Sequence, residues 1–190
     1  MYMKKVLPGE FNYLSYKKKM ETLKTILFFA VSFALFFAGW YTTKTRANLL
    51  TIVAVLGMLP ACKSAVETFM YLKAKGCSET LKNTLSGHVE ALQHSYSMVF
   101  TTPSDGTFEV PSIVVKNNTI CGLVEHPYKK LPQLEKHITD ICKQNGFKVV
   151  VKIFEKEDAY LARLTQLLEA ETNSEKLDQE EMTLLHQISL

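Results

Sequence analysis

The sequence lacks the short motifs by which many enzymes can be recognised. None of the five histidines belongs to an H-E-x-x-H zinc motif, and no two of the four cysteines have C-x-x-C spacing. The eight glycines are scattered and form no phosphate-binding loop, and no serine stands in a G-x-S-x-G context. The sequence therefore predicts no catalytic residue, no metal site and no cofactor, and it names no reaction.

Charge is absent from the nineteen residues between Thr25 and Thr43. As a helix this segment would be about 28 Å long, close to the ~30 Å hydrocarbon core of a bilayer. Trp40 and Tyr41 lie where interfacial aromatic residues are found. We expect a first transmembrane helix here. The alternatives are a buried core helix, which is rarely so apolar on all sides, and a cleaved signal peptide, whose apolar region is shorter.

A second uncharged segment of sixteen residues runs from Ala47 to Cys62. At about 24 Å it is short for a span, but Lys63 can extend it by placing its ammonium group at the interface. Pro60 removes a backbone donor and predicts a kink. Two interpretations fit, a kinked span and a re-entrant segment. We expect the span, and therefore a transmembrane helical hairpin over residues 25–72.

Lysine placement predicts the topology of this hairpin. Six lysines, against two glutamates, precede the first span in residues 1–24, and further lysines follow the second span, whereas the turn carries only Lys44 and Arg46. Because positively charged flanks stay in the cytoplasm, we expect a multi-pass protein of the cell (inner) membrane with both termini cytoplasmic. Residues 1–24 would be a basic juxtamembrane segment, and residues 73–190 a cytosolic domain with acidic C-terminal helices.

The segment after the hairpin has the pattern of a small α/β (α+β) domain. Helical periodicity and runs of β-forming residues predict the element order α-β-β-β-α-β-α-α. The expected helices cover residues 76–93, a segment from Pro132, residues 158–171 and residues 178–188, and the expected strands cover residues 95–101, 108–115, 119–125 and 147–154. The fourth strand returns through a crossover helix, so it should lie parallel to one of the first three in a mixed four-stranded sheet.

Turn residues and proline refine this arrangement. Asn117 and Asn118 tolerate positive φ and predict a two-residue hairpin turn. Gly146 is placed to end the helix that begins at Pro132. Pro111 marks an edge strand or a bulge. The strand of residues 147–154 is mostly apolar, which favours an interior position in the sheet.

Apolar spacing predicts which side chains the helices bury. We expect Leu134, Ile138 and Ile141 of one helix, and Leu161, Leu164 and Leu168 of the next, to face the core. Asp178 and Glu181 have capping-box spacing at the expected start of the last helix.

The element order α-β-β-β-α-β over about residues 78–154 resembles the core of restriction-endonuclease-like domains. In that family an acid on the second strand and an E-x-K on the third bind a divalent metal that activates water. The corresponding acids here are Glu109 and Glu125, with Asp105 nearby, but His126-Pro127 follows Glu125 in place of the family's lysine. The resemblance implies a membrane-tethered nuclease-like hydrolase, whereas the residues alone predict acids that face water.

Thr43–Glu67, with the sequence TKTRANLLTIVAVLGMLPACKSAVE, resembles small two-span membrane proteins of Gram-positive bacteria that have no assigned function. The resemblance implies a bacterial membrane protein and no reaction.

Two further groups of residues are candidate sites. His126, Lys129 and Lys130 lie in a strand-to-helix connection, where a basic loop at a helix N-terminus can hold an anion; an ordinary surface loop is the alternative. Lys63 lies at the edge of the second span and predicts an interfacial anchor, or a functional lysine that faces an intersubunit cavity.

The sequence therefore predicts a non-catalytic, membrane-anchored domain that binds a protein partner, a small anionic ligand or a second copy of itself. The acidic C-terminal part makes nucleic acid an unfavourable partner, since both carry negative charge. The alternatives are the nuclease-like hydrolase and an oligomeric membrane effector whose cytosolic domain senses a ligand and rearranges the hairpin.

Overall fold

The computed structural model describes residues 6–44, 49–89, 92–102, 106–125, 130–171 and 175–190. The chain forms two compact units. One comprises Leu14–Ala74, and the other combines Met1–Tyr13 with Lys75–Leu190. We call them the hairpin unit and the α/β unit.

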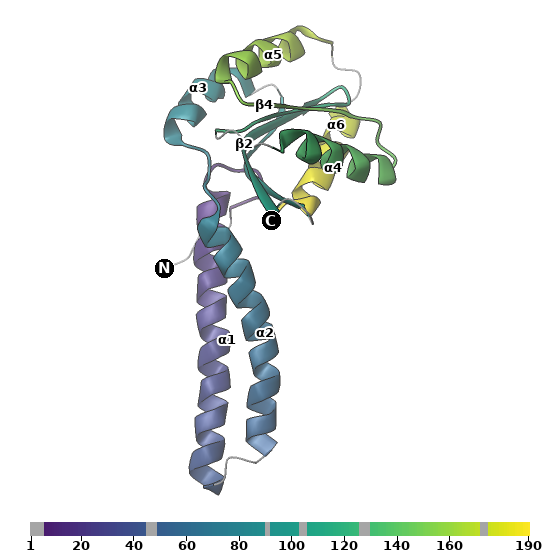
Figure 1. Cartoon of the computed structure of the whole chain (residues 1–190). Helices are drawn as coiled ribbons and strands as arrows, with labels where there is room; N and C mark the ends of the chain where they lie inside the picture. Colours follow the sequence, from purple (N-terminus) through teal and green to yellow (C-terminus); the bar gives the residue numbers. More distant parts are fainter. Residues whose placement is uncertain (1–5, 45–48, 90–91, 103–105, 126–129, 172–174) are drawn as a thin grey trace. The chain divides into compact units, whose positions relative to one another are not determined.

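The hairpin unit consists of two long helices, α1 (Tyr13–Thr43) and α2 (Leu49–Lys73) (Figure 1). The Thr25 hydroxyl lies 2.8 Å from the hydroxyl groups of both Ser64 and Thr68, so the two helices are joined side by side. α1 begins before the lysine-rich segment that precedes the predicted span, and α2 is continuous through Pro60. Both helices are long and apolar enough to cross a membrane.

The hairpin buries small and polar side chains and exposes large apolar ones. The buried residues of α2 are spaced at three, four or seven positions, so they share one face of the helix; they are Ala54, Ala61, Ser64, Thr68 and Tyr71. Ser32 of α1 is also buried, and its Oγ lies 2.9 Å from the position that a Cβ at Gly57 would occupy. A soluble pair of helices shows the opposite pattern, with apolar residues at the contact. Close contact through small residues is typical of helices packed in lipid.

The α/β unit confirms the predicted element order. Its elements are α3 (Glu79–Val89), β1 (Gln93–Thr102), β2 (Gly106–Lys116), β3 (Thr119–Leu123), α4 (Leu131–Gln144), β4 (Val150–Phe154), α5 (Glu157–Glu169) and α6 (Glu175–Ile188). The strands form one mixed sheet in the order β1-β2-β3-β4. β1, β2 and β3 pair antiparallel, and β4 pairs parallel with β3, as the crossover through α4 requires.

Helices cover both faces of this sheet (Figure 1). α4 and α6 lie on one face, where Leu134, Ile138 and Leu185 join a core with Ile113 and Ile120 of the sheet. α3 and α5 lie on the other face, and their buried residues include Leu85, Tyr160 and Leu164. The sheet therefore separates two apolar layers.

Two local predictions are confirmed. Asn117 and Asn118 connect β2 to β3 with φ values of 48° and 59°, both in the left-handed region that the two-residue turn requires. Gly146 follows α4 with a φ of 88°, and the N–H of Phe147 donates to the Cys142 carbonyl at 2.9 Å. This is the hydrogen bond by which a glycine ends a helix.

The predicted interior position of the fourth strand is wrong, because β4 is an edge strand. Its apolar residues have another cause. Ile153 is buried in the core that includes α4. Its apolar character therefore reflects packing against a helix on one face of the sheet and does not require a strand on each side. On the opposite face Val150 is 67% exposed.

The interpretation of Pro111 also needs correction, since β2 lies between two strands and its register with β1 continues on both sides of this proline. Proline cannot donate to the ladder, and the pairing is interrupted only at this position. Ser97, which lies opposite, adopts a φ of 56° inside β1.

Asp178 and Glu181 do not form a capping box. α6 begins at Glu175, so both lie within the helix, and both are buried. The backbone N–H groups of Asn117 and Asn118 donate hydrogen bonds to Asp178. The spacing identified two acids on one helix face, but the sequence alone placed the helix start too late.

The inward faces of two helices each differ from the predicted face at the last predicted residue. Leu134, Ile138 and Leu164 are buried as predicted. The next inward residue is Cys142 in place of Ile141 in α4, and Leu167 in place of Leu168 in α5. Period alone does not distinguish neighbouring residues at the border of a buried face.

Two glycines give a matched test of this backbone. A Cβ at Gly146 or at Gly87 of α3 would meet nothing within 4 Å, so only backbone conformation distinguishes them. Gly146→Ala should destabilise the α/β unit by about 1 kcal/mol, because of its positive φ. Gly87→Ala should stabilise it by about 0.5–1 kcal/mol, because alanine favours a helix.

Urea unfolding of the detergent-solubilised full chain, followed by hydrogen exchange of the sheet amides, measures both effects. A shift of the same sign in both variants would contradict the assigned helix end.

Candidate functional site

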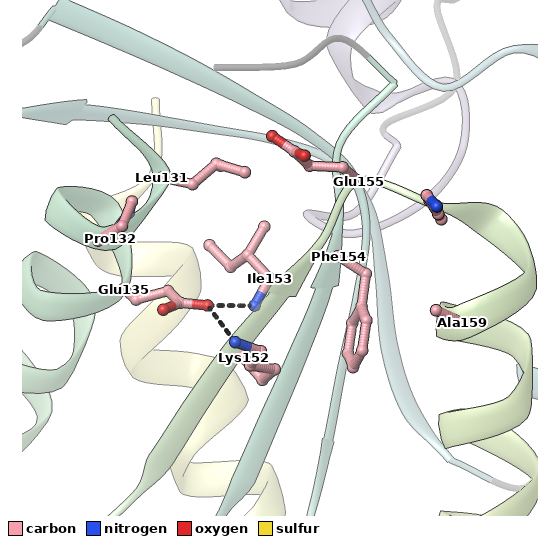
Figure 2. Close-up of a pocket in the computed structure, with 9 residues that line it drawn as sticks. Leu131, Pro132, Glu135, Lys152, Ile153, Phe154, Glu155 and Ala159 are labelled. Atoms are coloured by element: carbon pink, nitrogen blue, oxygen red, sulfur yellow. Dashed lines mark hydrogen bonds and ion pairs between the residues drawn. The ribbon is translucent and has the colours of Figure 1, made fainter. Parts of the chain in front are cut away.

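A pocket of about 410 Å³ lies at the carboxyl end of β4 (Figure 2). β3 and β4 are parallel, so the chain leaves both strands at the same side of the sheet to enter α4 and α5. Such positions are frequent ligand sites in α/β sheets. The lining residues come from the start of α4, the end of β4 and the start of α5; they are Leu131, Pro132, Glu135, Lys152, Ile153, Phe154, Glu155, Lys156 and Ala159.

Charged side chains surround an apolar floor in this pocket. Glu135 Oε1 accepts the backbone N–H of Ile153 at 2.8 Å and lies 3.8 Å from the Lys152 ammonium group. Figure 2 shows Glu135 reaching from α4 towards the edge strand. This carboxylate takes the place that the carbonyl of an added strand would occupy. The outward N–H of Ile153 is therefore already satisfied, so a partner segment would be held by the charged and apolar side chains of the pocket and not by strand addition at Ile153.

The predicted anion-binding loop lies only partly in the described chain. Lys130 is the residue immediately before α4, with a φ of −122°, and its neighbour Leu131 lines the pocket. His126 and Lys129 lie outside the described residues. Lys130, the described end of this loop, is thus the residue next to a pocket-lining residue in the chain.

Glu109 and Glu125, the acids suggested by the nuclease resemblance, both bind the connection between α2 and α3. Glu109 Oε1 accepts the Lys75 N–H at 2.9 Å, and Glu125 Oε1 accepts the Ser78 hydroxyl at 3.0 Å. Asp105 lies outside the described residues. Across the described ranges, no group of three His, Cys, Asp or Glu side chains could hold a metal ion.

Ser97 completes this arrangement, which we call the connector clasp (Ser97, Glu109 and Glu125). The Ser97 hydroxyl accepts the Cys77 N–H at 2.8 Å. Ser97 makes this contact with its backbone in the left-handed region. Burial, with the Glu125 charge nearby, raises the pKa of the Cys77 thiol to about 11 and keeps it protonated near neutral pH. Three hydrogen bonds therefore fix the chain directly after α2.

The segment before α1 is bound to the same strand. The Gly9 carbonyl accepts the Tyr96 N–H at 2.9 Å, and the Phe11 ring packs edge-on against Tyr96 with centroids 5.9 Å apart. The Lys82 ammonium group lies 4.6 Å from the centre of the Phe11 ring. Both chain segments that flank the hairpin are thus anchored on β1.

Buried polar pairs on β1 and β2 are the residues that sequence reasoning missed. His94 Nε2 lies 3.0 Å from Ser112 Oγ, which lies 2.8 Å from the Tyr160 hydroxyl; His186 Nε2 lies 3.0 Å from Ser95 Oγ. Both serines are fully buried. Burial lowers the pKa of His94 to about 4, so the imidazole is neutral at pH 7. The only sequence signal was polar residues at core positions of strands.

Lys63 lies on the outward surface of α2. Its side chain is 80% exposed in the isolated chain, and its ammonium group lies 3.9 Å from the Glu67 carboxylate one turn further on. This is the ion-pair spacing of a helix surface.

Comparisons with protein-family models, with curated proteins and with solved structures found no match. Function must therefore be inferred from the geometry of this chain.

The connector clasp makes a direct prediction. Ser97→Ala leaves the Cys77 N–H without its acceptor, which should cost about 1–3 kcal/mol of local stability. The rate of Cys77 alkylation in the full chain, measured by mass spectrometry, should rise roughly tenfold or more. Ser86→Ala is the matched control, because the Ser86 hydroxyl is exposed and donates to the Asn83 carbonyl of its own helix. Equal Cys77 rates in both variants would show that Ser97 does not hold the connector.

Proposed function

We propose that this chain is a two-span protein of the bacterial cell membrane whose α/β unit is a non-catalytic interaction domain. It binds a protein partner through the pocket at the carboxyl end of β4. The observation that carries the proposal is this pocket, where charged side chains of both signs border an apolar floor and an edge strand.

The hairpin supports a membrane location. Its contact surface holds small and polar residues, and Thr25, Ser64 and Thr68 satisfy one another's hydroxyl groups. Its outer surface exposes large apolar side chains such as Phe33, Leu56 and Leu59. Exposed to water this surface would be costly, whereas in lipid it is the favourable arrangement.

Lysine distribution supports an orientation with both termini and the α/β unit in the cytoplasm. The helix α1 carries Lys17, Lys18 and Lys19 before its uncharged part, so a basic helical surface would lie beside the lipid head groups.

The surroundings of the two acids favour binding over hydrolysis. Glu109 and Glu125 accept hydrogen bonds from the connector. A nuclease would need such carboxylates free for a metal ion. The described lining of the pocket contains no His, Cys, Ser or Thr side chain that could act as a nucleophile or imidazole base.

The oligomeric effector is the second candidate, and the connector favours it. The segments before α1 and after α2 are both hydrogen-bonded to β1 or β2. A partner that changes β1 would therefore act on both segments that continue into the hairpin.

Topology can be tested with single cysteines in a Cys62→Ser background, because the other three native cysteines are buried. An impermeant maleimide should label Lys44→Cys in intact cells. Lys176→Cys, at an exposed position of α6, should react only after permeabilisation. Labelling of both positions from the same side would refute the hairpin topology.

The pocket can be tested by charge reversal. Lys152→Glu places a second negative charge beside Glu135 and should reduce recovery of a pocket-bound partner roughly tenfold. Lys148→Glu, at an exposed position before β4, makes the same charge change outside the pocket. The measurement is crosslinking in cells, purification from native membranes and quantitative mass spectrometry of bound proteins. Identical sets of bound proteins for both variants would exclude the pocket as the partner site.

A further inference from the structure

The helix α6 closes one edge of the sheet. It packs on β1 and β2, on the same face as α4 (Figure 1). Beyond its last turn the Leu190 N–H donates to the Val99 carbonyl at 2.9 Å, and Ser189 forms an antiparallel bridge with Phe100. The release of α6 and of these last residues would therefore free the outer edge of β1 at Val99 and Phe100.

Glu181 lies in the buried face of α6. Its neighbours Met182 and Leu185 belong to the apolar core, and Glu181 itself is 0% exposed. Among the described residues neither of its carboxyl oxygens has a hydrogen-bond partner. A fully buried carboxylate without donors is a costly group, whereas the neutral acid is tolerated far better.

In the part of the chain that the structure describes, no cation compensates a charge on Glu181. Asp178, one turn earlier on α6, and Cys142 of α4 are the titratable groups that act on it. Lys116 of β2 and Glu175 of α6 act on Asp178, which also receives the N–H groups of Asn117 and Asn118. Burial raises the pKa of Asp178, although Lys116 and the two N–H groups favour its anion. When Asp178 is ionised, it further disfavours a charge on Glu181.

We propose that Glu181 is a proton-dependent latch, which holds α6 on β1 and β2 in its neutral form and loosens it when ionised. The consequence reaches the segment before the hairpin. His186 of α6 contacts Ser95, and a side chain at Gly9 would come within 3.0 Å of both. Loosening α6 would remove one wall of the site where Gly9 binds.

The expected direction follows from linkage. Burial first, and then Asp178, raises the pKa of Glu181 from 4.5 to about 7. The Glu181 carboxylate therefore binds its proton more tightly when α6 is packed on the sheet than when α6 is released. The attachment of α6 weakens as the pH rises from about 4.5 to 7 and stays constant above that range. Between pH 6 and pH 8 the opening equilibrium should rise roughly tenfold.

Hydrogen exchange of the full chain in lipid nanodiscs, corrected for intrinsic rates, measures this opening at the amides of α6. The wild-type chain should open about tenfold more at pH 8 than at pH 6. Glu181→Gln should abolish the difference, because the amide cannot ionise. Glu180→Gln, an equal charge change at an exposed position of the same helix, should keep it. Burial lowers the pKa of His94 to about 4 and lowers the pKa of His186. Any contribution of these histidines would persist in Glu181→Gln, so that variant separates it from the contribution of Glu181.

A wild-type chain without pH dependence, or a Glu181→Gln chain that retains it, would overturn the proposal. If Glu181→Gln fails to fold, NMR titration of the Glu181 carboxyl carbon in the wild-type chain decides. A midpoint near pH 7 supports the latch, and a midpoint below 5 overturns it.

Discussion

The parallel pairing of β4 with β3 is the constraint on which the α/β unit depends. Parallel neighbours cannot be joined by a tight turn, so the chain must cross one face of the sheet as α4. This crossing buries Leu134 and Ile138 against the sheet and brings the starts of α4 and α5 to the same side. The pocket at the end of β4 is a direct result, and it needs no dedicated loop.

At the opposite edge of the sheet, β1 binds three other segments of the chain. β1 receives Gly9 from before α1, Cys77 from after α2, and Leu190 from beyond α6. Most of these bonds are made by backbone groups, so they depend on the path of the chain more than on side-chain identity. The strand therefore contacts both segments that flank the hairpin in sequence and the residues that follow α6.

Sequence patterns recovered those features that arise from neighbouring residues. The turn at Asn117-Asn118 and the helix end at Gly146 depend on local φ preferences, and both are confirmed. The candidate acids show the limit of this approach. Glu109 and Glu125 were identified as acids near strand ends, but their hydrogen-bond partners, Lys75 and Ser78, lie 34 and 47 residues away. Spacing along the chain carries no information about such contacts.

The sequence by itself determined the two long apolar helices, the order of the later elements and the mixed sheet, because hydrophobic period and turn residues act over a few positions. Only the tertiary structure decided that β4 is an edge strand and that Asp178 and Glu181 are buried. An apolar strand can be covered by a strand or by a helix, and an acid can face water or a core. The surface that packs against each residue makes that choice, and that surface comes from distant parts of the chain.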